Sequence, residues 1–285
     1  MTETVAVTGA SGQLGRLVVE ALLRRNAGPI VAIVRNPAKV ADLAEQGVEI
    51  RQASYGDDEA FDRALAGVDR LLLISGTDFG DRVAQHTGVI RAAERAGVRL
   101  LAYTSIPRAD QNPMVLAQEH RDTEAVLAES TVPHVFLRNG WYWENYADRA
   151  AAAAEHGVLH GSAGEGRVSA AARADYAEAA AAVLTTDGHA GRSYELGGES
   201  LTYPALAQVI SEVSGKSVDY SDVSEAEYAA ALEQNGLPTP VAHVLANADT
   251  GIRDGWLDVT TGDLAELIGR PATPPAEVLR AVLAR

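Results

Sequence analysis

The sequence predicts an α/β fold with a doubly wound parallel sheet, followed by a smaller α/β region toward the C-terminus. Through the first half of the 285 residues, short runs rich in β-branched residues alternate with stretches of helical periodicity. The apolar residues of the short runs stand on consecutive positions, which is typical of strands that helices cover on both faces. These two observations predict a parallel sheet.

The predicted elements follow one another regularly up to residue 138. Strands are expected at residues 4–8, 30–34, 48–52, 70–75, 99–104 and 134–138, and helices at 15–25, 37–46, 59–66, 80–96 and 115–129. Beyond this point the pattern is less regular. A helix at 174–184, a strand at 192–196, a helix at 203–214, a strand at 217–220 and a capped helix start at 221–227 complete the expectation.

Three glycines lie between the first strand and the first helix. Gly9, Gly12 and Gly15 have the spacing G-x-x-G-x-x-G, in the strand-to-helix context that this motif requires. Gly9 permits a tight turn, Gly12 lets the backbone approach a pyrophosphate, and Gly15 lets the helix pack close to the sheet. Since free N–H groups at a helix start attract anions, this segment predicts a Rossmann-type dinucleotide-binding unit.

The residue after the second strand indicates which dinucleotide binds. An NAD-binding domain usually has an acidic residue here, which accepts hydrogen bonds from the ribose hydroxyl groups. This chain has Arg35 instead. A guanidinium group suits the 2′-phosphate of NADP, so NADPH is the expected cofactor.

The two predicted regions are expected to bind the cofactor and the substrate, respectively. Residues 1–150 are predicted to form the NADP-binding Rossmann domain, with segments that complete the sheet extending to about residue 190. Residues 151–285 are predicted to form a smaller α/β region on the substrate side.

Composition excludes several other classes of function. The 39 acidic residues outnumber the 24 basic ones, giving a formal charge of -15, which disfavours binding to nucleic acid or anionic membranes. There is no cysteine, so disulfides, thiolate nucleophiles and cysteine-based metal sites are excluded. No export signal is evident and the apolar runs are too short for a membrane span. A cytoplasmic protein that binds no metal is expected.

Four stretches resemble a known family. They are residues 8–15, 34–39, 137–142 with 144–146, and 173–177. Together they resemble the NmrA-like branch of atypical short-chain dehydrogenases, and most of all its type 2 NAD(P)H:quinone oxidoreductases. The stretch Arg-Asn-Gly-Trp-Tyr at 138–142 is the most discriminating part of the resemblance. A departure follows the third strand, where many members have an acidic residue and this chain reads Ala53-Ser54-Tyr55.

The resemblance implies site residues position by position. It implies that the pyrophosphate binds to the glycine-rich segment, that is, to Gly9, Ala10, Ser11, Gly12, Gln13 and Leu14. It implies that Arg35 binds the 2′-phosphate, and that Ser75 and Gly76 lie along the adenosine ribose or the pyrophosphate. It also implies that Asn139, Gly140, Trp141 and Tyr142 border the nicotinamide and the substrate, and that Arg173 reaches the cofactor. A homodimer is a further implication of the family.

The lysines and tyrosines of the chain limit how a proton can be transferred to a substrate. Ordinary short-chain dehydrogenases transfer a proton through a Tyr-x-x-x-Lys pair, but Lys39 and Lys216 are the only lysines here and neither follows a tyrosine at that spacing. A quinone needs less assistance, because hydride transfer produces a delocalised hydroquinone anion. Hydride transfer from NADPH without a flavin is therefore reasonable, with catalysis depending chiefly on positioning of the two rings.

Several side chains are candidates for the remaining roles. His120, which replaces a lysine of related reductases and titrates near neutral pH, is the candidate proton donor, with a structural histidine as the alternative. His120 and Glu124 share a helix face, but two ligands alone do not make a metal site.

Other candidates have equally plain structural explanations. Ser105 is a candidate contact for nicotinamide or a loop serine. Trp141, Tyr142 and Trp143 either form a wall for a quinone ring or pack structurally, and Asp175 is expected to cap a helix.

The sequence thus predicts an NADPH-dependent oxidoreductase that acts on a quinone or a similar flat conjugated acceptor, with Asn139, His120 and Trp141 as catalytic candidates. Two alternatives stay open. One is a reductase of an electrophilic double bond, and the other is a non-catalytic NADP(H)-binding redox sensor of the NmrA type.

Overall fold

The computed structural model describes residues 3–76, 78 and 80–284 and divides the chain into two compact units. Unit 1 contains residues 1–109, 119–139 and 173–194, and unit 2 contains residues 110–118, 140–172 and 195–285. The chain thus passes between the units several times, whereas the sequence predicted a main boundary near residue 150 with sheet-completing segments up to about residue 190. Segments distant in sequence complete each unit because strand pairing and helix packing join them.

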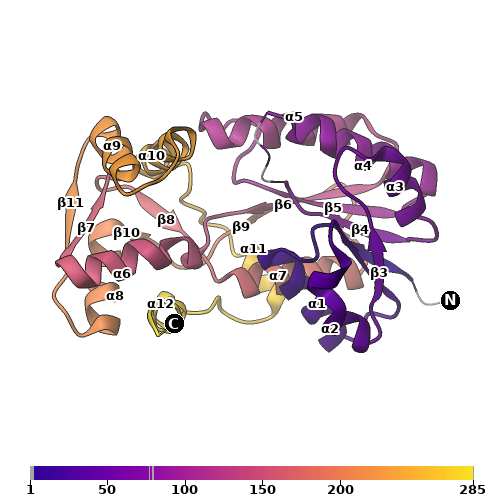
Figure 1. The fold of residues 1–285 in the computed structure, drawn as a ribbon, viewed down its shortest axis with the longest axis horizontal. Coiled ribbons are helices and arrows are strands. Elements are labelled where there is room, and N and C mark those ends of the chain that lie inside the picture. The colour runs from indigo at the N-terminus through magenta and orange to yellow at the C-terminus, as the bar shows by residue number, and fades with distance from the viewer. Residues whose placement is uncertain (1–2, 77, 79, 285) are drawn as a thin grey trace. The chain divides into compact units, whose positions relative to one another are not determined.

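Within the described residues, unit 1 is built on a seven-stranded sheet with the order β3-β2-β1-β4-β5-β6-β9 (Figure 1). Its strands are β1 (Val5–Val7), β2 (Ile30–Val34), β3 (Glu49–Gln52), β4 (Arg70–Leu73), β5 (Leu100–Ser105), β6 (His134–Asn139) and β9 (Ser193–Leu196), the last of which continues into unit 2. The pairs from β3 to β6 are parallel. Strand order reverses direction beside β1, so the crevice between the ends of β1 and β4 is where such sheets bind ligands.

Helices cover both faces of this sheet (Figure 1). They are α1 (Gln13–Arg24), the 3₁₀ turn η1 (Pro37–Val40), α2 (Ala41–Glu45), α3 (Asp58–Ala64), α4 (Arg82–Ala96), α5 (Val115–Glu129) and α7 (Arg173–Thr185). α1 packs on α7 and α3 packs on α4. The strand residues of β1, β2, β4 and β5 are buried throughout, as the consecutive apolar runs predict.

Unit 2 combines two small sheets with helices. β7 (Val158–Gly161) pairs with β11 (Asp219–Asp222) in parallel, and β8 (Arg167–Ser169) pairs with β10 (Ser200–Thr202) antiparallel. The helices are η2 (Trp143–Tyr146), α6 (Ala147–His156), α8 (Tyr203–Ser214), α9 (Glu225–Gln234), α10 (Thr239–Arg253), α11 (Asp263–Ile268) and α12 (Pro275–Leu283).

The predicted α/β fold with a doubly wound parallel sheet is confirmed, with local differences. The helix expected at 37–46 is split into η1 and α2, because Asn36 caps a turn that begins at Pro37. The strand expected at 217–220 lies two residues later, as β11. The predicted capped helix is α9, where Ser224 and Glu227 form a reciprocal capping box. The sequence pattern did not predict α10, α11, α12 or the short strands β7, β8 and β10. Each of these strands pairs only with a segment distant in the sequence.

Unit 2 contains an ion pair between the half-buried Arg149 and the buried Asp249. The guanidinium of Arg149 lies 5.0–5.4 Å from the ring centres of Tyr146, Tyr203 and Tyr228, and its Nη2 lies 3.3 Å from Asp249 Oδ2. Asp249, only 3% exposed, also accepts a hydrogen bond from Tyr203 Oη at 2.5 Å. Aromatic faces and a paired carboxylate compensate the lost hydration of the guanidinium.

Helices long and apolar enough to cross a bilayer are absent from residues 3–76, 78 and 80–284.

Candidate functional site

The glycine-rich segment forms a tight turn between β1 and α1. Gly9 has φ +59°, a conformation that glycine adopts without strain, and the N–H of Gly12 donates to the carbonyl of Gly9 at 2.8 Å. A Cβ on Gly15 would lie 2.3 Å from Gly9 O and 2.8 Å from Ala10 Cα. Only a glycine at position 15 allows the helix to start this close to the turn.

The start of α1 is suited to an anion. Gly12 precedes the helix without a capping side chain, and no acidic residue occurs in the first turn, all of which is described. The N–H groups of the first turn have no partner within the helix. Gly9, Gly12 and Gln13 are exposed and Ser11 is half-buried. Ala10 and Leu14 are buried, so these two predicted contacts can only be made through their backbone.

A buried threonine and a tyrosine brace this turn. Thr8 Oγ1 accepts from the N–H of Ile74 at 2.9 Å and lies 2.8 Å from Tyr55 Oη, which donates to the carbonyl of Ile74 at 2.6 Å. Tyr55 therefore ties the end of β1 to the end of β4. In the sequence Tyr55 stands out only as a departure from the family, because 47 residues separate it from Thr8.

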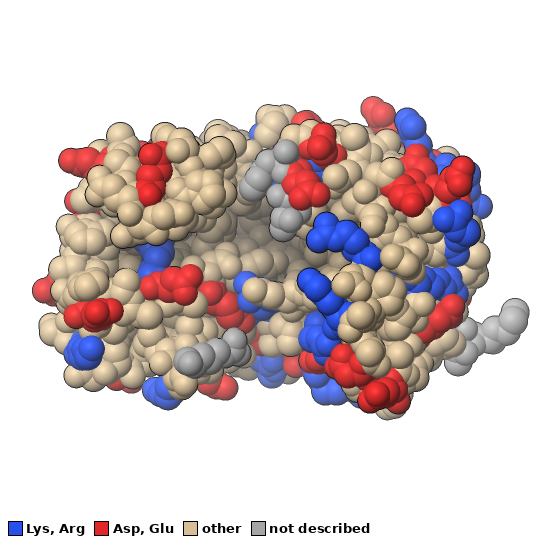
Figure 2. Space-filling view, in the orientation of Figure 1, with Lys and Arg blue, Asp and Glu red and all other residues tan. Residues whose placement is uncertain are grey.

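Arg35 stands at the end of β2 and is exposed. Gln52 Nε2 donates to its carbonyl at 3.1 Å, which fixes the backbone there. The described part of the chain provides no hydrogen bond or ion pair to its guanidinium group. By contrast, Arg16 is engaged by Asp42 at 2.7 Å. Figure 2 shows basic side chains gathered on this face of unit 1 around α1 and α2, among acidic ones.

Ser75 and Gly76 follow β4 and are half-buried. The N–H of Ser75 donates to Thr104 Oγ1 at 2.9 Å, and the N–H of Gly76 donates to His86 Nε2 at 3.0 Å. Both backbone donors are therefore used within the protein. The Ser75 hydroxyl and the carbonyl groups are what this segment can offer to a ligand.

His86 is fully buried with a defined tautomer. Its Nε2 accepts from a backbone N–H, so Nδ1 carries the hydrogen and donates to Thr123 Oγ1 at 3.1 Å. The Thr123 hydroxyl in turn donates to the carbonyl of Glu119 at 2.8 Å. Burial lowers the pKa of His86 to about 3, assisted by the charge of Arg82. His86 is thus a neutral link between the β4 loop and α5.

His120 lies on α5 beside the end of β5. Its Nδ1 is 2.8 Å from Tyr103 Oη, and the histidine is 7% exposed. Burial lowers the pKa of His120 to about 3, with further contributions from Arg82 and His86. The expectation that His120 titrates near neutral pH is therefore wrong, because the protein interior disfavours its charged form.

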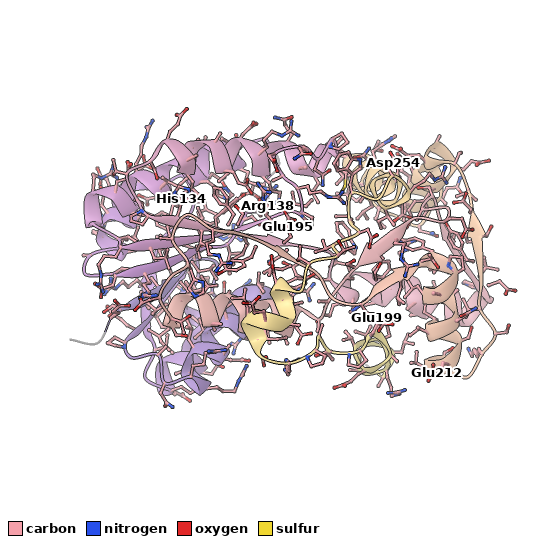
Figure 3. All side chains as sticks on the ribbon, turned by 180° about the vertical axis from the view of Figure 1, so that it is seen from behind. His134, Arg138, Glu195, Glu199, Glu212 and Asp254 are labelled. Carbon is pink, nitrogen blue, oxygen red and sulfur yellow. The ribbon has the colours of Figure 1, made fainter. Side chains whose placement is uncertain are left out.

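Ser105 and Glu124 are buried and form a polar cluster with the half-buried Arg138. Figure 3 labels Arg138 on unit 1. Ser105 Oγ donates to Glu124 Oε1 at 2.6 Å, and Arg138 binds the same carboxylate through two nitrogens at 2.7 and 3.0 Å. Ser105 and Glu124 are therefore held by the fold. The described residues include no group of three or more histidine, aspartate or glutamate side chains arranged to hold a metal.

The remaining predicted residues are distributed over both units. Asn139, 6% exposed, ends β6 in unit 1, and Arg173 begins α7 there. In unit 2, the N–H of Gly140 donates to Leu196 O at 2.8 Å, and the carbonyl of the half-buried Trp141 accepts from Ala171 at 3.0 Å.

Two predicted roles need correction. Trp143 is completely buried in unit 2, so it packs in the core and cannot line a wall, whereas Trp141 and Tyr142 are half-buried. Asp175 is not an N-cap. It lies inside the first turn of α7, which begins two residues earlier, and it is fully buried.

Several known proteins are similar to this chain in sequence and fold. Quinone oxidoreductase 2 of Escherichia coli strain K12 is 51% identical over 275 residues, covering 96% of each chain. The crystal structure of an NADPH-dependent quinone oxidoreductase from E. coli complexed with NADPH superposes with a TM-score of 0.95, at 50% identity, covering 98% of this chain and 99% of that one. The triphenylmethane reductase of Citrobacter sp. complexed with NADP(H) has a TM-score of 0.92, at 39% identity, covering 98% of this chain and all of that one. The model of the NmrA-like family matches residues 1–252, and the chain belongs to that family.

Proposed function

We propose that this protein is an NADPH-dependent oxidoreductase that transfers hydride to a quinone or a similar conjugated acceptor. The observation that carries the proposal is the uncommitted, exposed guanidinium of Arg35 at the same sheet edge as the glycine turn. The 51% identity with Quinone oxidoreductase 2 supports the choice of acceptor.

The residues of unit 1 fit the cofactor. The turn leaves no room for a Cβ at Gly15, and at Gly12 a Cβ would lie 3.2 Å from Gly9 O, so the turn packs directly against the start of α1. In this proposal the first-turn N–H groups of α1 bind the pyrophosphate and Arg35 binds the 2′-phosphate. Ser75 and Gly76 lie along the ribose or pyrophosphate, and Arg173 reaches the cofactor.

Bound NADPH supplies a hydride, that is, one hydrogen nucleus with two electrons. The chain has no Tyr-x-x-x-Lys pair, so its own contribution is to position the rings and to stabilise charge on the acceptor. We propose that Asn139, at the end of β6, and His120, beside the end of β5, border the reacting groups. The roles of Gly140 and Trp141 against nicotinamide and substrate stay predictions from the family.

The test is NADPH oxidation by purified protein with a panel of small benzoquinones, with NADH and enzyme-free controls. Saturable oxidation that prefers NADPH is expected. Arg35→Ala should abolish most of that preference, because one charge-assisted contact contributes about 1.5–3 kcal/mol, or roughly 10–100-fold in affinity. Arg91→Ala is the matched control, since Arg91 is an exposed arginine of α4. Unchanged cofactor preference in Arg35→Ala would refute the 2′-phosphate assignment.

The same assay separates the alternatives. A redox sensor would bind NADPH without consuming it in the presence of any quinone, and a double-bond reductase would respond only to electrophilic alkenes. Location in the cytoplasm and a homodimer stay predictions.

A further inference from the structure

Tyr103 of β5 and His120 of α5 form a hydrogen-bonded pair, and the positions of its hydrogens can be inferred. Tyr103 Oη and His120 Nδ1 lie 2.8 Å apart, with Tyr103 fully buried and His120 nearly so. The pair stands beside the carboxyl ends of β4 and β5, the edge at which parallel sheets bind ligands.

The hydrogen bond between Tyr103 and His120 has the tyrosine hydroxyl as its donor, for the following reason. If Tyr103 Oη accepted from Nδ1, its own buried hydrogen would have to turn to Thr123 Oγ1, which already accepts from His86 Nδ1 at 3.1 Å and donates to the carbonyl of Glu119 at 2.8 Å. A poorly formed hydrogen bond of a buried hydroxyl costs about 1–3 kcal/mol. If Tyr103 donates to Nδ1, both groups are satisfied. The tyrosine stays protonated because burial raises its pKa. His120 therefore carries its hydrogen on Nε2.

The Nε2–H group of His120 can donate a hydrogen bond to a ligand. No hydrogen bond joins it to any residue that the structure describes. The charged or titratable neighbours of the ring are Arg82 and His86 from α4, Tyr103 from β5, and Glu119 and Glu124 from its own helix. Arg82 Nη1 lies 3.5 Å from Glu119 Oε2, and the carboxylate of Glu124 is paired with the guanidinium of Arg138 on β6. Both carboxylates are therefore engaged by arginines, and neither is hydrogen-bonded to the histidine ring.

We propose that His120 donates a hydrogen bond from Nε2–H, as a neutral imidazole, to the substrate oxygen that becomes negative, and that Tyr103 is the positioning residue that fixes this tautomer. This inference rests on the proposed quinone reductase function. It differs from the sequence-based expectation, in which His120 gives up a proton.

The reaction balances without a proton from the protein. A C–H bond of the dihydronicotinamide breaks, and its hydrogen and two electrons pass to the quinone, leaving NADP⁺ and a hydroquinone anion. Water supplies the proton that completes the hydroquinone. His120 retains its hydrogen throughout and lowers the energy of the developing oxyanion. The low pKa of His120 supports this form, since an imidazolium would have to be charged against burial.

The direct test is ¹⁵N NMR of the histidine side chains in the NADP⁺-bound protein, with the His120 resonances assigned through its own Cβ. A protonated ring nitrogen and a bare one have clearly separate shifts. We expect protonated Nε2 and bare Nδ1, unchanged between neutral pH and about pH 5, since the pKa is about 3. A proton on Nδ1, or protons on both nitrogens, would overturn the proposal. This readout does not depend on turnover.

Kinetics of variants test the role. His120→Gln keeps a neutral N–H donor and should retain much more activity than His120→Leu, for which kcat should fall on the order of 10²-fold. Tyr103→Phe should lower kcat several-fold with little change in KM for NADPH, and its His120 resonances should move toward a mixture of tautomers. Tyr194→Phe is the matched control, because it removes a hydroxyl 2.7 Å from His189 Nδ1 elsewhere in unit 1.

The outcomes distinguish the two proposals. Equal losses in His120→Gln and His120→Leu, or a kcat that rises below neutral pH with an apparent pKa near that of free histidine, would overturn the neutral-donor role. If the NMR shows the expected tautomer but no quinone is reduced at all, the proposed function fails, and with it the role of His120 toward a substrate, while the Tyr103 assignment stands.

Discussion

Replacing Gly15 by alanine tests whether the glycine turn is built by close backbone contact. The new Cβ would lie 2.3 Å from Gly9 O and 2.8 Å from Ala10 Cα, both backbone atoms that no side-chain rotation can remove. Helix propensity alone would favour alanine by about 1 kcal/mol, but overpacking of this kind costs about 1–3 kcal/mol. We therefore expect a net loss of stability together with a displaced turn.

Gly88→Ala provides the matched control. Gly88 is also helical, and its Cβ would lie at the same distance, 2.3 Å, from Asp58 Oδ1. That atom belongs to an exposed side chain that can rotate away, so Gly88→Ala should leave stability unchanged or raise it by up to about 1 kcal/mol. The pair of variants separates backbone from side-chain contact at equal initial overlap.

The assay combines urea unfolding of each variant with NADPH titration. Gly15→Ala should lower the unfolding midpoint and weaken NADPH binding by on the order of tenfold or more, because the turn can no longer present its N–H groups in place. Gly88→Ala should bind NADPH as the unmodified chain does. If Gly15→Ala matches the unmodified protein in both measurements, the argument from close contact is refuted.

Three further outcomes follow from the structure. His86 and His120 have folded pKa values of about 3, below the unfolded value of about 6.5, so the unfolded state binds more protons in that window. Stability should therefore fall as pH drops below about 6.5, by about 2 kcal/mol for each histidine at pH 5, and unfolding titrations that show no such slope would contradict the burial argument. Asp249→Ala should cost about 2–4 kcal/mol, measured by urea unfolding, because it leaves the half-buried Arg149 without its carboxylate and the buried Tyr203 hydroxyl without its acceptor, and a loss below about 1 kcal/mol would show that the pair is dispensable. Tyr55→Phe should cost about 1–3 kcal/mol through its two lost hydrogen bonds and should also raise the Kd for NADPH, whereas an unchanged Kd would show that this brace does not hold the turn.

The local features of this protein could be predicted from its sequence alone. The glycine turn could be predicted because Gly9, Gly12 and Gly15 are contiguous with their strand and helix, and their roles depend on backbone geometry alone. The buried strands of unit 1 could be predicted for a similar reason, since a run of consecutive apolar residues has one stable environment, between two layers of helices.

Which side chains meet, and in which protonation state, depends on the packing of segments that are distant in the sequence. Tyr55 reaches Thr8 across 47 residues, His86 reaches Gly76 from the following helix, and Tyr103 meets His120 across 17 residues. No periodicity in the sequence records these pairs. The sequence pointed to His120 but assigned it the ordinary pKa of histidine, because desolvation depends on the neighbours that surround the ring and not on the residues beside it in the chain. The structure also decided between the two interpretations of Trp143, which packs in the interior, and it shows that Asp175 lies inside α7 and does not cap it.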